Sequence, residues 1–150
     1  MKVVIQRVSK ASVTITGQVK AKIAKGLLVL LGIKEDDDNS DIEWLVPKII
    51  SLRIFNDTEE KMNLSVSDID GDILVISQFT LHASTKKGNR PSFIKAARPD
   101  KANQLYQEFV KNLSDLYKRE IFTGSFGADM KVELINDGPV TIIIDTKQKE

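Results

Sequence analysis

The sequence has 150 residues and a nearly balanced charge, with 22 lysine and arginine residues against 21 aspartate and glutamate residues. A chain of this length and composition is typical of one soluble domain that buries roughly 70% of its unfolded surface, so it needs no disulfide or structural metal. The absence of cysteine excludes thiolate catalysis and zinc fingers, and the single histidine, His82, excludes multi-histidine metal sites and leaves one candidate base for a catalytic triad.

Alternating apolar residues predict a strand pair near the start of the chain. Apolar residues between positions 13 and 23 fall on one parity, and the pair turns near Gly17. The next apolar run, residues 26–33, predicts a buried strand, because it is far shorter than the roughly 20 residues that a membrane-spanning helix requires. Residues 1–12 carry charges among their apolar positions and no small-residue cleavage site, unlike a signal peptide. We therefore expect a β-meander over residues 2–33, in a cytoplasmic protein that does not bind membranes.

Two amphipathic helices are predicted further along the chain. Residues 40–43 (Ser-Asp-Ile-Glu) match a capping box, and apolar residues then follow at helical spacing up to Ile50, with a kink expected at Pro47. The second helix is expected after Pro99 and Asp100, where apolar residues recur at helical spacing. The remaining strands are expected at residues 52–55, 72–81, 120–126, 130–135 and 140–145.

Together these elements predict a fold of the α+β class. We expect a single domain, residues 1–146, in which a mainly antiparallel, curved sheet with barrel-like layers is covered by the two helices. Residues 147–150 are expected to form a frayed tail. This fold class does not by itself indicate a chemistry.

The predicted strand 72–81 changes character along its length. It is apolar on both faces at first, but Ser77, Gln78 and Thr80 make its carboxyl end polar. Polar side chains at the end of a buried strand are typical of a pocket floor. The pattern fits equally well a strand that runs out into solvent.

Charge is distributed unevenly along the chain. Residues 34–43 carry six acidic residues and one lysine, whereas the segment from Lys86 to Lys101 carries six basic residues and one aspartate. A flexible basic loop beside a pocket suits a phosphate-bearing ligand. The simpler interpretation is a solvated loop, and a lone histidine in such a loop, His82, is expected to be exposed.

Two further features call for a structural explanation. The segment 136–141 (Asn-Asp-Gly-Pro-Val-Thr) joins two apolar stretches and has the composition of a turn. Arg7 shares its strand parity with Val3 and Ile5, so its guanidinium either has a buried partner or reaches the rim of the sheet.

Two short motifs resemble those of a known family. SQFTL at residues 77–81 and DGPVT at residues 137–141 are similar to the two motifs of the D-aminoacyl-tRNA deacylases. The resemblance covers the whole chain. Its other blocks are MKVVIQRV at the amino terminus, LRIF (52–55), KMNLSV (61–66), KKGNRPSF (86–93) and FGADMKVELINDGPVT (126–141).

The resemblance implies a homodimeric enzyme that hydrolyses the ester between a D-amino acid and the terminal adenosine of tRNA. It implies an active site at the dimer interface, where a cis Gly138–Pro139 segment of one subunit enters the other subunit's pocket and excludes L-amino acids. Arg7 braces that segment. The pocket floor is then formed by Ser77, Gln78, Phe79 and Thr80. Phe126 and Met130 line the adenosine side, and tRNA contacts fall to Lys86, Lys87 and Arg90.

Two mechanisms follow for the ester hydrolysis. Thr80 is the obvious hydroxyl nucleophile, but a threonine is weak without an activating base. The favoured mechanism has backbone N–H groups near Phe79 and Thr80 holding the carbonyl oxygen while the 2′-hydroxyl of the RNA helps to activate water. It uses no cofactor and no metal. Glycine has no side chain, so a steric filter of this kind does not exclude glycyl-tRNA.

Two alternatives from other classes remain open. A non-catalytic nucleic-acid-binding module using the basic loop predicts tRNA binding without turnover. An editing relative acting on L-aminoacyl-tRNA predicts altered SQFTL or GPVT motifs, and both are intact in this chain.

Overall fold

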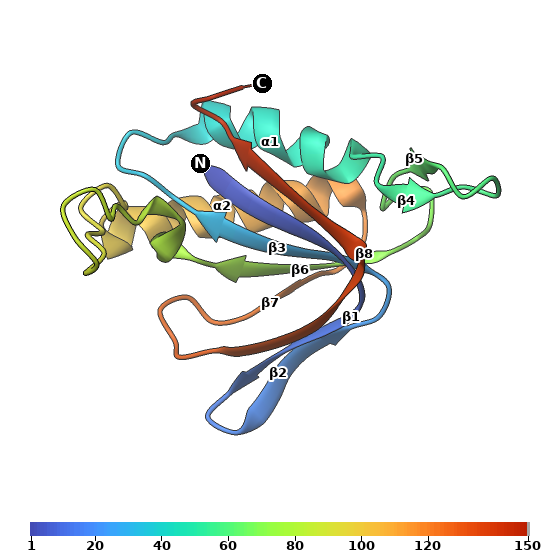
Figure 1. Ribbon diagram of the computed structural model, residues 1–150, viewed down its shortest axis with the longest axis horizontal. Helices are drawn as coiled ribbons and strands as arrows, with labels where there is room; N and C mark the ends of the chain where they lie inside the picture. Colours follow the sequence, from blue (N-terminus) through green and yellow to red (C-terminus); the bar gives the residue numbers. More distant parts are fainter. Residues whose placement is uncertain (150) are drawn as a thin grey trace.

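The sheet is built on one long strand, β1 (Lys2–Ile15), in the computed structural model, which describes residues 1–149 (Figure 1). β1 pairs antiparallel with β2 (Gln18–Ile23), β3 (Gly26–Gly32) and β8 (Lys131–Asp145). β6 (Asp72–Ser77) lies parallel to β3, and β7 (Ile121–Thr123) lies parallel to β6. Because β2 also approaches β6 and β7, the mixed sheet curls into a nearly closed barrel. The predicted α+β class is confirmed.

Both predicted helices form, and they pack against the same side of the sheet. α1 spans Asn39–Ser51 and α2 spans Pro99–Tyr117. The capping residue of α1 is Asp38 rather than the expected Ser40. The Ser40 N–H donates to Asp38, and the Asp38 N–H donates to Asp41, so the capping box starts two residues earlier than the sequence pattern indicated.

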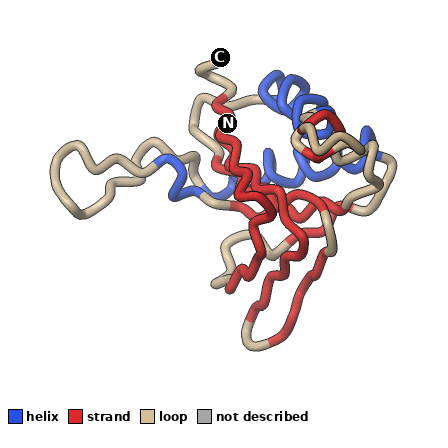
Figure 2. Tube along the Cα trace, turned by 45° about the vertical axis from the view of Figure 1, so that its right-hand side comes forward, coloured by secondary structure: helices blue, strands red, loops and turns tan. Residues whose placement is uncertain are grey.

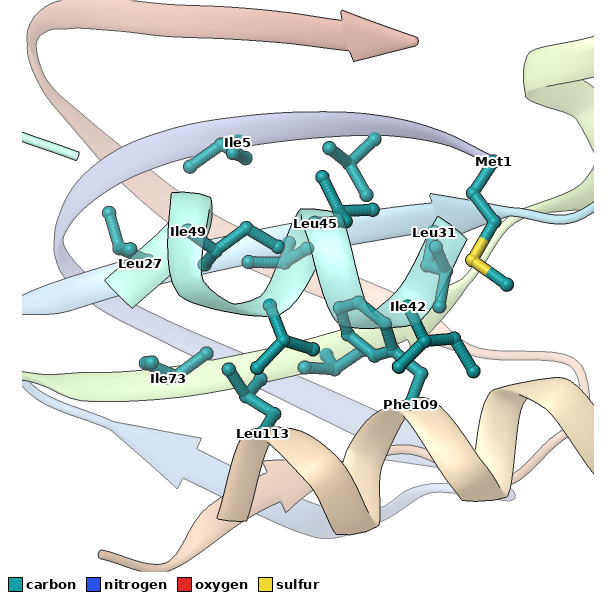
Figure 3. Packing of buried hydrophobic residues seen from close by; sticks show 14 of the residues in the cluster. Met1, Ile5, Leu27, Leu31, Ile42, Leu45, Ile49, Ile73, Phe109 and Leu113 are labelled. Carbon is teal, nitrogen blue, oxygen red and sulfur yellow. The ribbon is translucent and has the colours of Figure 1, made fainter. Parts of the chain in front are cut away.

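Strands β3 and β6 are buried on both faces. Leu27, Leu31 and Ile73 point into the core between the sheet and the helices, where they meet Leu45 of α1 and Phe109 of α2 (Figure 3). The alternate residues of the same strands, such as Leu28 and Leu74, join a second cluster inside the curl of the sheet. Burial on both faces explains why these strands are apolar at every position.

The two ends of the chain meet over α1 in a group of buried charges. The α-ammonium of Met1 donates to Asp37 Oδ1 and Thr146 Oγ1, both at 2.6 Å. Lys147 Nζ lies 2.8 Å from Asp41 Oδ2. Lys147, the first residue of the expected tail, therefore contacts α1, and Glu150 lies outside the described residues. Burial alone raises the pKa of Asp41, but hydrogen bonds from Lys147, Thr146 and the Asp38 N–H outweigh it and lower that pKa to about 2.

Two strand boundaries differ from the prediction. β6 ends at Ser77 instead of continuing to residue 81, and the chain turns at once into the 3₁₀ helix η1 (Phe79–His82). The turn expected at 136–141 and the strands on either side of it form one continuous strand, β8. Small differences also occur at the short hairpin, where β4 is Phe55–Asn56 and pairs with β5 (Met62–Leu64).

The segment 136–141 is a bulge because β1 holds β8 on both sides of it. Gln6 pairs with Thr141 and Val8 pairs with Asn136, so residues 137–140 all stand opposite Arg7. Inside the bulge, Asn136 Oδ1 accepts from the Val140 N–H at 2.8 Å. Turn-forming residues here widen a strand without ending it.

Candidate active site

A cavity of about 630 Å³ opens where β3 and β6 end. Ser77 pairs with Leu31, and the Gln78 N–H donates to the Leu31 carbonyl at 2.8 Å, so both strands finish at the same level. Five of the site residues implied by the resemblance line this one cavity: Ser77, Gln78, Phe79, Phe126 and Met130. The polar end of the strand is therefore a pocket floor and not a strand running into solvent.

The turn after the floor presents unpaired backbone donors. In η1 the Leu81 N–H donates to the Gln78 carbonyl, as a 3₁₀ helix requires. The preceding N–H groups, those of Phe79 and Thr80, have no acceptor among residues 1–149. Two adjacent free N–H groups at the edge of a pocket are suited to binding an oxyanion.

Thr80 lies beside the cavity and does not line it. Its side chain is exposed, and its hydroxyl accepts a hydrogen bond from Gln78 Nε2 at 2.5 Å. The side chain of His82, two residues later, points away into the protein: it is buried, with 4% of its surface exposed. The expectation of an exposed His82 was wrong, because the strand ends early and the 3₁₀ turn carries residue 82 back against Gly32.

The environment of His82 is apolar and offers its ring little. Nε2 is buried without a hydrogen-bond partner among the described residues. Burial lowers the pKa of His82, against the opposing influence of the Gly32 backbone and Asp37, and Lys2 and Lys34 lower it further. The imidazole is thus held neutral behind the turn, out of reach of the Thr80 hydroxyl.

Aromatic residues form the walls of the cavity. Phe79 and Phe93 pack edge to face with ring centroids 5.1 Å apart, and Tyr106 lies against Phe126 at 5.9 Å. Tyr106 is fixed from behind, because its hydroxyl donates to the Val75 carbonyl at 2.9 Å, and burial raises its pKa to about 12. Phe126 is therefore supported by a rigid, neutral phenol.

Arg7 is the partner of the bulge in β8. Its Nε donates to the Asp137 carbonyl at 2.7 Å, and its Nη1 donates to the Ile54 carbonyl at 2.7 Å and to Asn56 Oδ1 at 3.2 Å. The guanidinium is buried rather than extended to the rim. Beyond Asp137, the exposed Gly138–Pro139 bond is cis. A β-carbon at residue 138 would lie 2.8 Å from Arg7 Nη2, so only glycine fits there.

The two family motifs lie at opposite ends of β3 within one chain. Arg7, opposite the bulge, pairs with Leu27, whereas the cavity floor is level with Leu31. Four residues along a strand span about 13 Å. Gly138 and Pro139 accordingly do not line the cavity of their own chain.

The basic residues lie on the long loop between η1 and α2, which extends away from the sheet (Figure 2). An isolated bridge between Ser84 and Ser92 closes the base of this loop. Its three candidate tRNA contacts are all exposed: Lys86, Lys87 and Arg90. The acidic segment, in contrast, is partly structural, since Asp37 and Asp41 are buried in the contacts described above.

The described residues contain no group of three or more histidine, cysteine, aspartate or glutamate side chains placed to hold a metal ion. No helix within residues 1–149 has the length and apolar character to cross a membrane.

A protein-family model described as D-Tyr-tRNA(Tyr) deacylase matches residues 4–145. The chain belongs to this deacylase family. Curated D-aminoacyl-tRNA deacylases from Flavobacterium johnsoniae and Flavobacterium psychrophilum are 63% and 65% identical to it over 150 residues, covering 100% of both chains in each case. The family and the enzyme class expected from the two motifs are therefore confirmed; the class is a hydrolase.

Two solved structures resemble this member of the deacylase family. One, titled "c-Myc DNA Unwinding Element Binding Protein", has a TM-score of 0.92 and 44% identity over 97% of this chain and 98% of that one. The other, titled "Structural Analysis of a probable eukaryotic D-amino acid tRNA deacylase", has a TM-score of 0.83 over 95% and 97% of the two chains. At 16% identity the second supports the fold alone.

Sequence reasoning missed three residues of the deacylase site. Phe93 and Arg98 line the cavity, and Tyr106 supports its wall. Phe93 lies in the block KKGNRPSF, which was available as a signal, whereas Arg98 counted only as one more charge in a basic segment. Tyr106 looked like an ordinary core position of α2.

Proposed function

We propose that this protein hydrolyses the ester bond of D-aminoacyl-tRNA, releasing the free D-amino acid and tRNA. The observation that carries the proposal is the meeting of the SQFTL strand end with Phe126 and Met130 in one cavity. That cavity is large enough for an aminoacyl-adenosine, and it has aromatic walls for a base and polar groups at its floor.

In the proposed reaction the main chain does most of the work of the protein. The ester carbonyl oxygen accepts hydrogen bonds from the Phe79 and Thr80 N–H groups, which are free to donate. Water attacks the carbonyl carbon, the bond to the ribose oxygen breaks, and that oxygen takes a proton and leaves with the tRNA. The 2′-hydroxyl of the terminal ribose assists in activating the water. Thr80 lines the approach without acting as nucleophile, because the only imidazole is buried and faces away.

The proposed enzyme is a homodimer in which the Gly138–Pro139 segment of one subunit closes the other subunit's cavity. Three observations support this arrangement. The segment is exposed, Arg7 fixes it, and it lies about 13 Å along β3 from its own chain's cavity. As a chirality gate it reads the α-carbon and leaves the side chain unread, which admits D-amino acids in general and glycine, and rejects L-amino acids. Lys86, Lys87 and Arg90 contact the tRNA backbone.

The activity is tested with matched substrates. We expect the purified protein, without added metal or cofactor, to release D-tyrosine from D-Tyr-tRNA and to leave L-Tyr-tRNA intact. Equal rates on the two enantiomers refute the chirality gate. Binding of tRNA with no turnover of either substrate favours the rival function, a non-catalytic nucleic-acid-binding module.

Mixed dimers test whether the gate acts on the partner. Gly138→Val disrupts the gate through its clash with Arg7, and Ser77→Phe fills the cavity. A mixed dimer of the two variants contains one open cavity facing one intact gate only if the gate comes from the partner. We expect D-selective activity to return on mixing the two inactive proteins. Its failure to return in mixed dimers shown to form contradicts the trans arrangement.

A further inference from the structure

Two charged side chains line the described cavity, Arg98 and Asp129. Asp129 is neutralised locally, because Lys131 Nζ lies 2.9 Å from its carboxylate. The guanidinium of Arg98 has neither an ion-pair nor a hydrogen-bond partner among residues 1–149; only its backbone N–H is engaged. Arg98 therefore contributes the uncompensated charge of the cavity rim.

The backbone under Arg98 is fixed to the rest of the protein. The Arg98 N–H donates to Glu35 Oε2 at 3.1 Å, and the Ala97 N–H donates to the Ile33 carbonyl at 2.9 Å. Pro99 then begins α2. The root of the side chain is thus held at the rim while the exposed guanidinium is free to take an anion. A free cationic group on a fixed backbone loses little entropy in binding beyond that of its own rotamers.

The substrate of the proposed function offers one anion at this position. The ester must lie on the floor, near Ser77 and Phe79, so the chain that leads to the rest of the tRNA leaves through the mouth. The α-amino group is cationic and the adenine is neutral, whereas the 5′-phosphate of the terminal adenosine is negative. A planar guanidinium binds two phosphate oxygens at once.

We propose that Arg98 binds the 5′-phosphate of the terminal adenosine and so positions the ester over the floor of the cavity. This inference rests on the proposed function. It assigns a role to a residue outside both motifs, and it explains why a mostly apolar cavity has an arginine at its mouth.

The test compares substrates with and without that phosphate. D-Tyrosine is esterified to the 3′-oxygen of adenosine and of adenosine 5′-monophosphate, and both esters are offered to the wild type and to Arg98→Gln. We expect Arg98→Gln to lower kcat/KM on the phosphorylated ester by about tenfold or more, mainly through KM, and to change the adenosine ester less than about twofold. Lys95→Gln, an exposed neutralisation outside the cavity lining, changes neither ester by more than about twofold.

Other outcomes overturn the assignment. An equal loss on both esters means that Arg98 supports the fold or another part of the substrate, and no loss on either means that it binds nothing there. A selective loss on D-aspartyl-adenosine relative to D-tyrosyl-adenosine assigns the guanidinium to acidic amino-acid side chains instead. If the wild type hydrolyses no ester, the proposed function fails, and titration with adenosine 5′-monophosphate and adenosine then decides the role of Arg98: a preference for the phosphate that Arg98→Gln abolishes supports it, and equal binding overturns it.

Discussion

Replacing Arg7 by lysine tests the anchoring of the bulge in β8. The guanidinium donates to the Asp137 and Ile54 carbonyls through two different nitrogens, each at 2.7 Å. A lysine keeps the charge but has one nitrogen, so it reaches at most one of these carbonyls at a time. A hydrogen bond to a charged group contributes about 1.5–3 kcal/mol, and a buried carbonyl left unpaired costs about 1–3 kcal/mol. We therefore expect Arg7→Lys to lower the free energy of unfolding by about 2–4 kcal/mol.

Urea unfolding followed by circular dichroism measures this loss. With an m-value of about 2 kcal/mol/M, the midpoint should fall by about 1–2 M. Arg53→Lys is the matched control: Arg53 also donates from Nε to a carbonyl, that of Asn63 at 2.9 Å, but at an exposed site where we expect a change below about 0.5 kcal/mol. An Arg7→Lys midpoint as close to wild type as that of the control would refute the reasoning.

Four further predictions concern catalysis, tRNA binding and pH. Thr80→Ala should keep at least about a tenth of the single-turnover rate, since no base activates the hydroxyl; an acyl-enzyme trapped on Thr80 would contradict this. Neutralising the loop should reduce the salt dependence of tRNA binding by about one unit of slope for each phosphate that the loop no longer neutralises; the residues changed are Lys86, Lys87 and Arg90. His82 resists protonation when folded, so stability should fall as pH drops below about 6.5, by up to about 1.4 kcal/mol per pH unit more in the wild type than in His82→Gln. The lowered pKa of Asp41 gives stability that is present above pH 3.8 and lost toward pH 2, so Asp41→Asn should unfold more easily by about 2 kcal/mol at pH 7, and urea titrations should show that difference disappearing below pH 3.

The sequence predicted the regular elements well, because their signals are local. The strand pair turning near Gly17, the doubly buried strands β3 and β6, and both helices follow from hydrophobic periodicity. The end of β6 was misplaced because Phe79 and Leu81 continue the apolar pattern while the chain has already turned into η1. A turn that preserves apolar alternation gives no local sign of where the strand stops.

The segment 136–141 was misread for a different reason. Its composition predicts a turn correctly, but whether a turn ends a strand or bulges within it depends on the neighbouring strand. Here β1 pairs with β8 on both sides of the bulge, and that pairing joins residues more than 120 positions apart. His82 was misplaced by the same limitation, since its burial against Gly32 is a tertiary contact.

Arg7 connects this unpredictable geometry with the proposed chirality gate. A D- and an L-amino acid differ only in which substituents of one carbon exchange places, so a gate that tells them apart by contact must hold its position closely. Displacements of about 1 Å are enough to change rates a hundredfold. A loop tip does not have that rigidity, whereas a bulge fixed within a 15-residue strand and bound by a buried guanidinium to the Ile54 carbonyl does. A side chain that looked misplaced on an apolar strand is thus what joins the bulge to the core, and the rigidity of the proposed gate depends on it.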